Sequence, residues 1–143
     1  MTSSAVSPLG MFGLLRAAGT VSDFVESRLA TIGLSIPKLA ALQRLTDAGG
    51  SMPLGQLAGR LACVKSNVTQ LIDRLETDGL VQRSVDPVDK RSRLAILTEA
   101  GRTACEEGIR IQRAAETEVF ASLSQEEASQ LAEIISKLAP HHC

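Results

Sequence analysis

Three cysteines and two histidines are the side chains best suited to redox or metal chemistry in this chain. Cys63, Cys105 and Cys143 are widely spaced and odd in number, which fits neither a disulfide framework nor a zinc finger. Cys63 is a candidate oxidant sensor, but a free cysteine also packs as a small apolar residue. The histidines directly precede Cys143, and adjacent ligands at a chain end seldom form a closed metal site. Because no nucleophile–base–orienter set or glycine-rich phosphate loop is recognisable either, we expect no catalytic residues, no metal and no cofactor.

Basic side chains in the middle of the chain could bind phosphates instead. The protein has 143 residues and a formal net charge of −1. Residues 54–98 carry seven bases and five acids, whereas residues 99–143 carry four bases and eight acids. We therefore expect the middle segment to face nucleic acid and the acidic end to point away from it. The chain has no Trp or Tyr and only three Phe, which argues against stacking on single-stranded bases.

The residues around these bases show helical spacing. A helix is predicted over 65–78, because four apolar residues fall on one face: Val68, Leu71, Ile72 and Leu75. Its polar faces hold the candidates for contacts with base edges, which are Ser66, Asn67, Thr69 and Gln70. Lys65 and Arg74 are the candidates for phosphate contacts on the same helix. With a shorter helix predicted just before it, this segment is typical of a helix-turn-helix.

A hairpin with a basic tip is predicted directly after this helix. Its strands are expected at 80–83 and 93–98. Lys90 and Arg91 in the turn are expected against the minor groove, where narrow width and negative potential favour arginine. Asp89 would brace Arg91 and fix its direction, and Arg93 on the second strand would contact phosphate. The two elements together predict a winged helix-turn-helix.

Further helices are predicted on both sides of this unit. Ser35 is a possible N-cap for one of them, and Ser124 opens a capping box for the last. The expected helices span 9–30, 36–47, 54–61, 99–123 and 125–138, and a short extended piece is expected at Ser51 and Met52. No segment is long and apolar enough for a membrane span, and the N-terminus does not read as a signal peptide, so we expect a cytoplasmic protein without a membrane partner.

Three short motifs give the chain a specific resemblance. They are D-R-L-E-x-x-G-L-V at 73–81, D-P-x-D-x-R at 86–91 and L-T-x-x-G at 97–101. Together they resemble the MarR family of bacterial transcription regulators, and the flanking helices lie where that family places its dimerisation helices. The resemblance implies a triangular homodimer, pseudo-palindromic DNA and control by a small ligand or by oxidation.

Two residues depart from the expected helix starts. Val64 stands where a Ser or Thr N-cap would precede the recognition helix, which costs about 0.5–2 kcal/mol unless another group caps it. Pro53 likewise replaces the usual cap before the shorter helix, although proline is tolerated near a first turn.

The expected fold is mainly α with a small β wing, in three parts. These are an N-terminal dimerisation helix (1–35), a winged helix-turn-helix DNA-binding domain (36–98) and C-terminal dimerisation helices (99–143). Phe12 and Phe24 are candidates for a ligand pocket where the first helix meets the winged domain, with core packing or dimer contact as the alternative.

The expected function is a sequence-specific regulator of transcription that binds double-stranded DNA. We expect a ligand-responsive repressor that acts as a homodimer, with its two recognition helices about 34 Å apart. A small-molecule effector between the long helices and the winged lobes could change that spacing. Two alternatives remain open: a winged-helix module that binds protein and not DNA, and a redox-sensing regulator that uses a cysteine.

Overall fold

The computed structural model describes residues 8–61 and 67–139 of the chain. In order, its elements are α1 (Pro8–Ala30), α2 (Ile36–Asp47), β1 (Ser51–Pro53), α3 (Leu54–Arg60), α4 (Val68–Thr77), β2 (Val81–Val85), β3 (Arg93–Leu97), α5 (Glu99–Val119) and α6 (Gln125–Leu138). This arrangement confirms the expected class, mainly α with a small β wing. Among the described helices, none combines the length and the apolar character needed to cross a bilayer.

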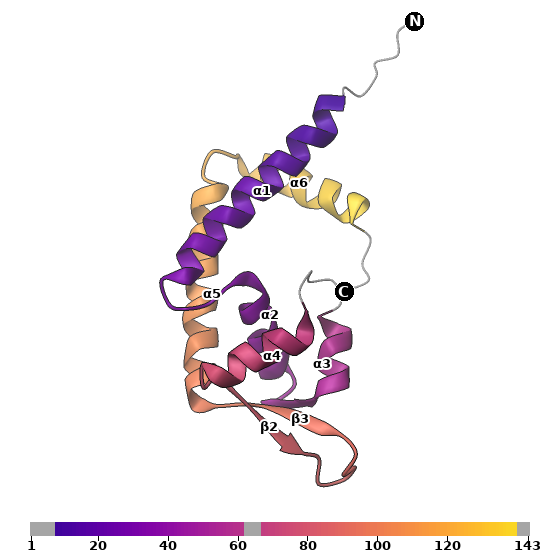
Figure 1. The fold of residues 1–143 in the computed structure, drawn as a ribbon. Coiled ribbons are helices and arrows are strands. Elements are labelled where there is room, and N and C mark those ends of the chain that lie inside the picture. The colour runs from indigo at the N-terminus through magenta and orange to yellow at the C-terminus, as the bar shows by residue number, and fades with distance from the viewer. Residues whose placement is uncertain (1–7, 62–66, 140–143) are drawn as a thin grey trace, which may run out of the picture.

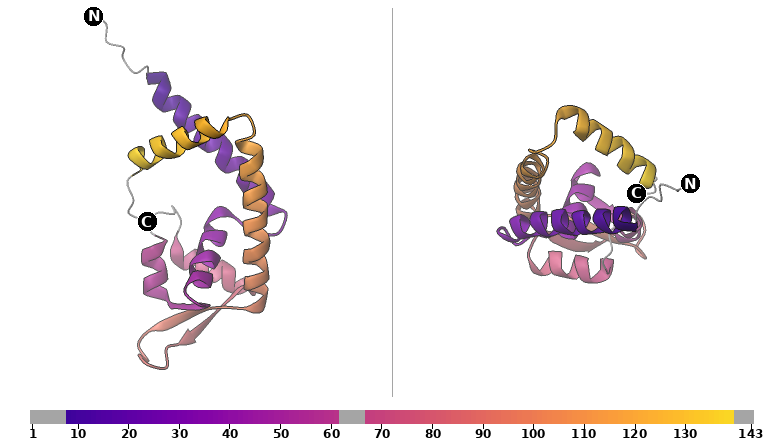
Figure 2. Two further views of the ribbon diagram at one scale, coloured as in Figure 1. Left: turned by 180° about the vertical axis from the view of Figure 1, so that it is seen from behind. Right: turned by 90° about the horizontal axis from the view of Figure 1, so that it is seen from above.

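Helix α5 runs along most of the molecule and joins its two ends (Figure 1). The small helices α2, α3 and α4 lie with the sheet at one end, and the β2–β3 hairpin extends beyond them. Helices α1 and α6 lie toward the other end, and the view from above shows them extending to one side of α5 (Figure 2). The molecule is therefore divided into a winged lobe and a helical end, with α5 as the connection.

Predicted caps start two of the helices, and Thr98 caps a third. Ser35 Oγ accepts a hydrogen bond from the Lys38 amide at 3.3 Å, which starts α2. Thr98 Oγ1 accepts from the Gly101 amide at 3.0 Å, which starts α5. The capping box at Ser124 is formed in full at the start of α6. Each side chain satisfies an amide that the first helical turn would otherwise leave without a partner.

Helix α5 ends earlier than the sequence predicted, at Val119 and not at 123. Ser124 must adopt an extended backbone to cap α6, and its φ and ψ are −69° and 164°. The chain therefore has to leave the helical conformation before that residue. A capping box so close behind a helix is a stop signal for that helix as well as a start signal for the next.

The sheet is larger than the predicted hairpin. Strand β2 continues to Val85, which pairs with Arg93, so the turn contains only residues 86–92. The short extended piece predicted around Met52 forms β1 and pairs with β3, giving the antiparallel order β1-β3-β2. Met52 is buried opposite Ala95, and this burial holds the third strand in place.

A core of aliphatic side chains fills the winged lobe. Its centre includes Leu42, Leu45, Leu57 and Leu75, which are all fully buried. The stripe predicted for α4 faces this core: Leu71, Ile72 and Leu75 are buried, and Val68 packs against them from a partly buried position. The opposite face of α4 is consequently left to solvent or to a partner.

The end of α4, the start of the wing and the start of α5 meet at a single junction. The Thr98 amide donates to the Leu80 carbonyl at 3.1 Å, and Thr98 Oγ1 donates to the Gly79 carbonyl at 2.7 Å. A Cβ atom on Gly101 would lie only 2.1 Å from the Leu80 carbonyl oxygen. The glycine therefore allows helix α5 to approach the backbone at Leu80, and the G-L-V and L-T-x-x-G motifs form one contact.

Replacing this glycine should destabilise the fold. Gly101→Ala should lower the free energy of unfolding by about 3 kcal/mol, because a methyl group cannot share the space of the Leu80 carbonyl and the backbone must shift. Urea denaturation at fixed protein concentration measures the change. The matched control is Gly59→Ala, where a Cβ meets nothing within 4 Å and helix propensity should add about 0.5–1 kcal/mol. Equal stability of the two variants would contradict the assigned junction.

Candidate nucleic-acid interface

Helix α4 presents a polar surface on the side opposite the core. Thr69, Gln70, Asp73 and Arg74 are all exposed. The helix has 10 residues and a length of about 15 Å, shorter than the 14 residues predicted from the sequence. It is still long enough to lie in a major groove with its first turn against base edges.

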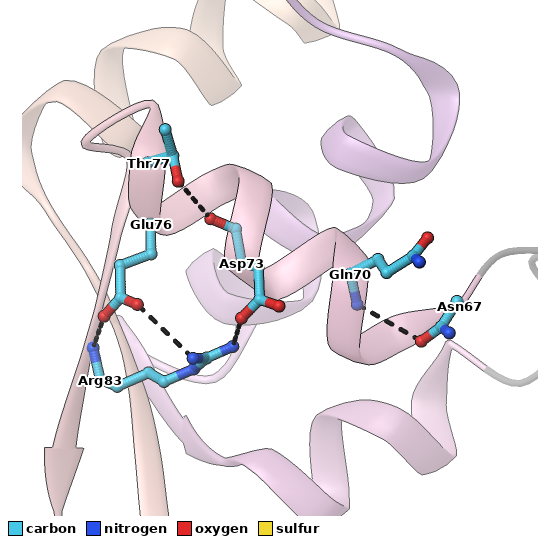
Figure 3. A network of polar contacts seen from close by, with 6 residues as sticks. All are labelled: Asn67, Gln70, Asp73, Glu76, Thr77 and Arg83. Atoms are coloured by element: carbon cyan, nitrogen blue, oxygen red, sulfur yellow. Dashed lines mark hydrogen bonds and ion pairs between the residues drawn. The ribbon is translucent and has the colours of Figure 1, made fainter.

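The start of α4 differs from the prediction because Asn67 is its N-cap. Asn67 has an extended backbone, and its Oδ1 accepts a hydrogen bond from the Gln70 amide at 3.3 Å (Figure 3). The cap that Val64 could not provide is thus supplied three residues later. Asn67 was predicted as a base contact, and the structure gives its side-chain oxygen a role in the helix start. Thr69 and Gln70 remain in the exposed first turn.

Several predicted residues lie outside the described part of the chain. Cys63, Val64, Lys65 and Ser66 precede α4 there, and the tail 141–143 lies beyond α6. Their assigned roles, phosphate contact for Lys65, base contact for Ser66 and oxidant sensing for Cys63, stay predictions. Within residues 8–61 and 67–139 no group of His, Cys, Asp and Glu is arranged to hold a metal ion.

The tip of the wing is shaped by two aspartates. Asp86 Oδ1 accepts from the Val88 amide at 2.9 Å, and Asp89 Oδ1 accepts from the Arg91 amide at 3.1 Å. Asp89 thus braces Arg91 through its main chain, and none of the described ion pairs joins the two side chains. Lys90 and Arg91 are exposed at this tip.

Two further predicted phosphate contacts are exposed on the same lobe. Arg93 is the first residue of β3 and pairs with Val85, so it lies at the base of the turn. Arg74 lies on α4 beside the polar face. The winged lobe therefore carries exposed bases on both the helix and the hairpin, as phosphate binding requires.

Arg83 is a residue that sequence reasoning left out of the site. It lies on β2, and its guanidinium forms ion pairs with Asp73 and, at 3.5 Å, with Glu76, both on α4 (Figure 3). Its backbone amide also donates to Glu76 Oε2 at 3.2 Å. The sequence signal was the spacing of the two acids, three residues apart on one helix face, but their partner on a strand depends on tertiary structure.

An apolar groove of about 670 Å³ lies between α1, α2, α5 and α6. Its lining is mainly aliphatic, with Phe120 as its aromatic residue and Gln43, Gln112 and Glu116 among its polar ones. Phe12 and Phe24, the predicted pocket residues, are not part of this lining, which corrects that assignment. The Phe12 side chain is 54% exposed, and the Phe24 ring lies under the Arg28 guanidinium at 4.6 Å.

Large apolar side chains are exposed along the helical end of the molecule. On α1 and α6 they are Met11, Phe12, Leu14, Leu15, Val21, Ile134, Ile135 and Leu138. A monomer in water rarely leaves so many large apolar residues uncovered. This surface is suited to association with another chain, and it lies away from the wing (Figure 1).

Cys105 is not placed for redox sensing. Its side chain is 2% exposed in the core, where Thr46 Oγ1 lies 3.6 Å from the sulfur. A sensing thiol has to be reached by oxidant and by a resolving thiol, and this one is reached by neither without opening the core. The apolar packing role expected for a buried cysteine fits its position.

Comparison with known proteins places the fold and the interface in context. The model of the MarR family matches residues 34–92. The uncharacterized HTH-type transcriptional regulator YkoM of Bacillus subtilis is 35% identical over 126 residues, which cover 88% of this chain and 81% of YkoM. A probable transcriptional regulator from Pseudomonas aeruginosa superposes with a TM-score of 0.80 at 31% identity, covering 93% of this chain and 98% of that one.

A structure with nucleic acid has the same fold. A mutant MarR from E. coli, complexed with operator DNA, superposes with a TM-score of 0.77 at 21% identity, covering 94% of this chain and 96% of that chain. The fold of this chain is therefore also the fold of a protein that has been crystallised with operator DNA.

The cap of α4 can be tested separately from any contact that Asn67 makes. Asn67→Ala should lower the free energy of unfolding by about 1 kcal/mol, because the Gln70 amide loses its acceptor. Asn67→Ser retains an acceptor oxygen and should stay within about 0.5 kcal/mol of the parent. Urea denaturation of the three proteins measures both changes. Equal losses in the two variants would show that α4 does not start at this cap.

Proposed function

This chain belongs to the MarR family, and we propose that it is a ligand-responsive repressor that binds pseudo-palindromic duplex DNA as a homodimer. The observation that carries the proposal is α4, whose apolar face is fixed in the core while its polar face lies free beside a hairpin with a basic tip. The relatives reported above carry the names of transcriptional regulators. A regulator of this kind acts on chromosomal DNA, which favours a cytoplasmic location.

The proposal assigns a role to the main exposed polar groups of α4 and the wing. Thr69 and Gln70 lie in the first turn of α4 and would contact base edges in the major groove. Arg74 and Arg93 would bind phosphates and fix the register. Arg91 would enter the minor groove next to the site, with Lys90 on the adjacent backbone. Lys65, Ser66 and Asn67 would contribute from the start of the recognition helix.

The exposed apolar residues of α1 and α6 support the homodimer. Burying them between two protomers removes a large apolar surface from water, and a two-fold axis would then set the two copies of α4 about one turn of DNA apart, roughly 34 Å. In this proposal residues 1–35 and 99–143 form the dimer and residues 36–98 bind DNA. The two parts are packed together at residue 35, because Leu29 and Leu34 are buried in the core of the winged lobe.

The apolar groove is the proposed effector site. Helix α2 lines it with Leu39, Ala40 and Gln43, and the same helix touches the recognition helix through Lys38, whose Nζ lies 2.8 Å from Asp78 Oδ2 at the end of α4. A small apolar molecule that shifts α2 would therefore shift the end of α4. This connection supports control of DNA affinity by a bound ligand.

A gel-shift titration on the DNA that flanks the protein's own gene tests the proposal. We expect a discrete complex that resists non-specific competitor and weakens by about 10³–10⁵ between 50 and 200 mM salt, if six to ten phosphates are contacted. If that DNA is not bound, selection from random duplexes replaces it. Failure of both with reduced protein at low salt would contradict DNA binding and favour a protein-interaction module.

The wing should contribute to affinity without contributing to stability. Arg91→Ala should weaken operator binding by about tenfold or more, because the dimer loses two minor-groove contacts, and should leave the melting temperature unchanged, because Arg91 is exposed. Arg113→Ala is the matched control, since it removes the same charge near the far end of α5. Equal DNA affinity of the two variants would show that the wing does not contribute to the interface.

A further inference from the structure

We infer that Arg83 is a positioning residue for DNA binding, which holds the wing against the recognition helix and neutralises two carboxylates beside it without contacting DNA. The inference rests on the proposed function, since it concerns the same interface. Arg83 lies between the two DNA-binding elements. Its inferred role differs from the roles proposed for Arg74, Arg91 and Arg93.

The side chain and the backbone amide of Arg83 both contact the recognition helix. Its guanidinium pairs with Asp73 through one terminal nitrogen and with Glu76 through the other, the latter at 3.5 Å (Figure 3). Its backbone amide binds Glu76 Oε2 at 3.2 Å. One residue of β2 is therefore fixed to α4 by both its side chain and its main chain.

The two carboxylates lie where a negative charge would oppose DNA. Asp73 follows Gln70 by three residues and so falls on the same face of α4, the face proposed to enter the major groove. Glu76 continues this row by another three residues. Without Arg83, two negative charges per protomer would face the phosphates with no positive charge paired to them, and like charges brought together at an interface weaken binding.

Arg83 also fixes the orientation of the wing relative to α4. Arg83 pairs with Ala95, so the strand is fixed to the core on one side and to α4 on the other. The basic tip at Lys90 and Arg91 extends from the same two strands. A hinge motion at this point would move the tip relative to α4, and both elements must reach adjacent grooves at once.

Stability and affinity should respond differently to the loss of these contacts. The three side chains are 32%, 54% and 42% exposed for Arg83, Asp73 and Glu76. Exposed pairs of this kind contribute little to folding, because water screens the charges. The loss of these pairs should matter when bound DNA replaces that water with phosphates. The affinity for DNA should therefore fall, while the melting temperature stays within about 3 °C.

The competing interpretation is that Arg83 itself binds a phosphate. In that case its contribution would not depend on Asp73 or Glu76. A lysine would also replace it well, because an ammonium binds phosphate as a point charge. A positioning role requires both nitrogens of the guanidinium, and a single ammonium cannot reproduce the two pairs.

A mutant cycle on the selected operator separates the two interpretations. The proteins are the parent, Arg83→Ala, the double variant Asp73→Asn with Glu76→Gln, and the triple variant that combines all three changes. We expect Arg83→Ala to weaken binding by about tenfold. We expect the triple variant to bind within about threefold of the double variant, because Arg83 has no charge to compensate there. Arg113→Ala is the control for loss of one positive charge.

Two further readouts keep the test independent of folding. Hydroxyl-radical footprints should show that Arg83→Ala loses protection in the minor groove under the wing and keeps the contacts of α4. Arg83→Lys should recover only part of the affinity, and it serves as the test if the alanine variant does not fold.

The outcomes that would overturn the inference are distinct from failure of the proposed function. If Arg83→Ala costs the same affinity with and without the carboxylates, or if lysine restores it fully, Arg83 binds phosphate directly. If Arg83→Ala behaves as Arg113→Ala does, Arg83 has no role at the interface. If the parent protein binds no duplex at all, it is the proposed function that fails.

Discussion

The close approach of Gly101 to the Leu80 carbonyl is the contact on which the rest of the structure depends. It joins three elements at one point: the end of α4, the first strand of the wing and the start of α5. Because the three elements meet at this point, the recognition helix and the wing are joined in one lobe. Helix α5 carries the orientation of that lobe to the apolar surface of the helical end. A dimer formed there can therefore set the spacing of two distant DNA-binding lobes.

Much of the fold could be predicted because periodicity and capping are local properties. The stripe at Leu71, Ile72 and Leu75 predicted the buried face of α4, and Ser35 and Ser124 predicted two helix starts. The predicted start of α4 at residue 65 was too early. The spacing of apolar residues does not show which residue caps a helix, and here the N-cap is Asn67. The strand at Met52 was read only as an extended piece, since its partner in β3 lies more than forty residues away.

The site was predictable where exposure decides it and not where tertiary contacts decide it. Lys90, Arg91 and Arg93 lie exposed in and beside the wing turn, where alternation and turn residues placed them. Arg83 was counted only as one base among seven, because its pairs with Asp73 and Glu76 form between a strand and a helix. The sequence analysis predicted Phe12 and Phe24 as pocket residues, whereas Phe120 lines the groove. The spacing of residues along a helix does not give the angles at which helices pack against one another.

Changing the spacing of the half-sites tests whether the dimer holds its two winged lobes at a fixed separation and binds two grooves on one face of the duplex. Operators with five base pairs inserted at the centre turn one half-site by about half a helical turn. Their affinity should fall about a hundredfold or more, toward the non-specific level, while the uninterrupted operator keeps its affinity. Equal affinity for both operators would mean that the two winged lobes bind independently, and it would contradict the role given to α5 and the dimer.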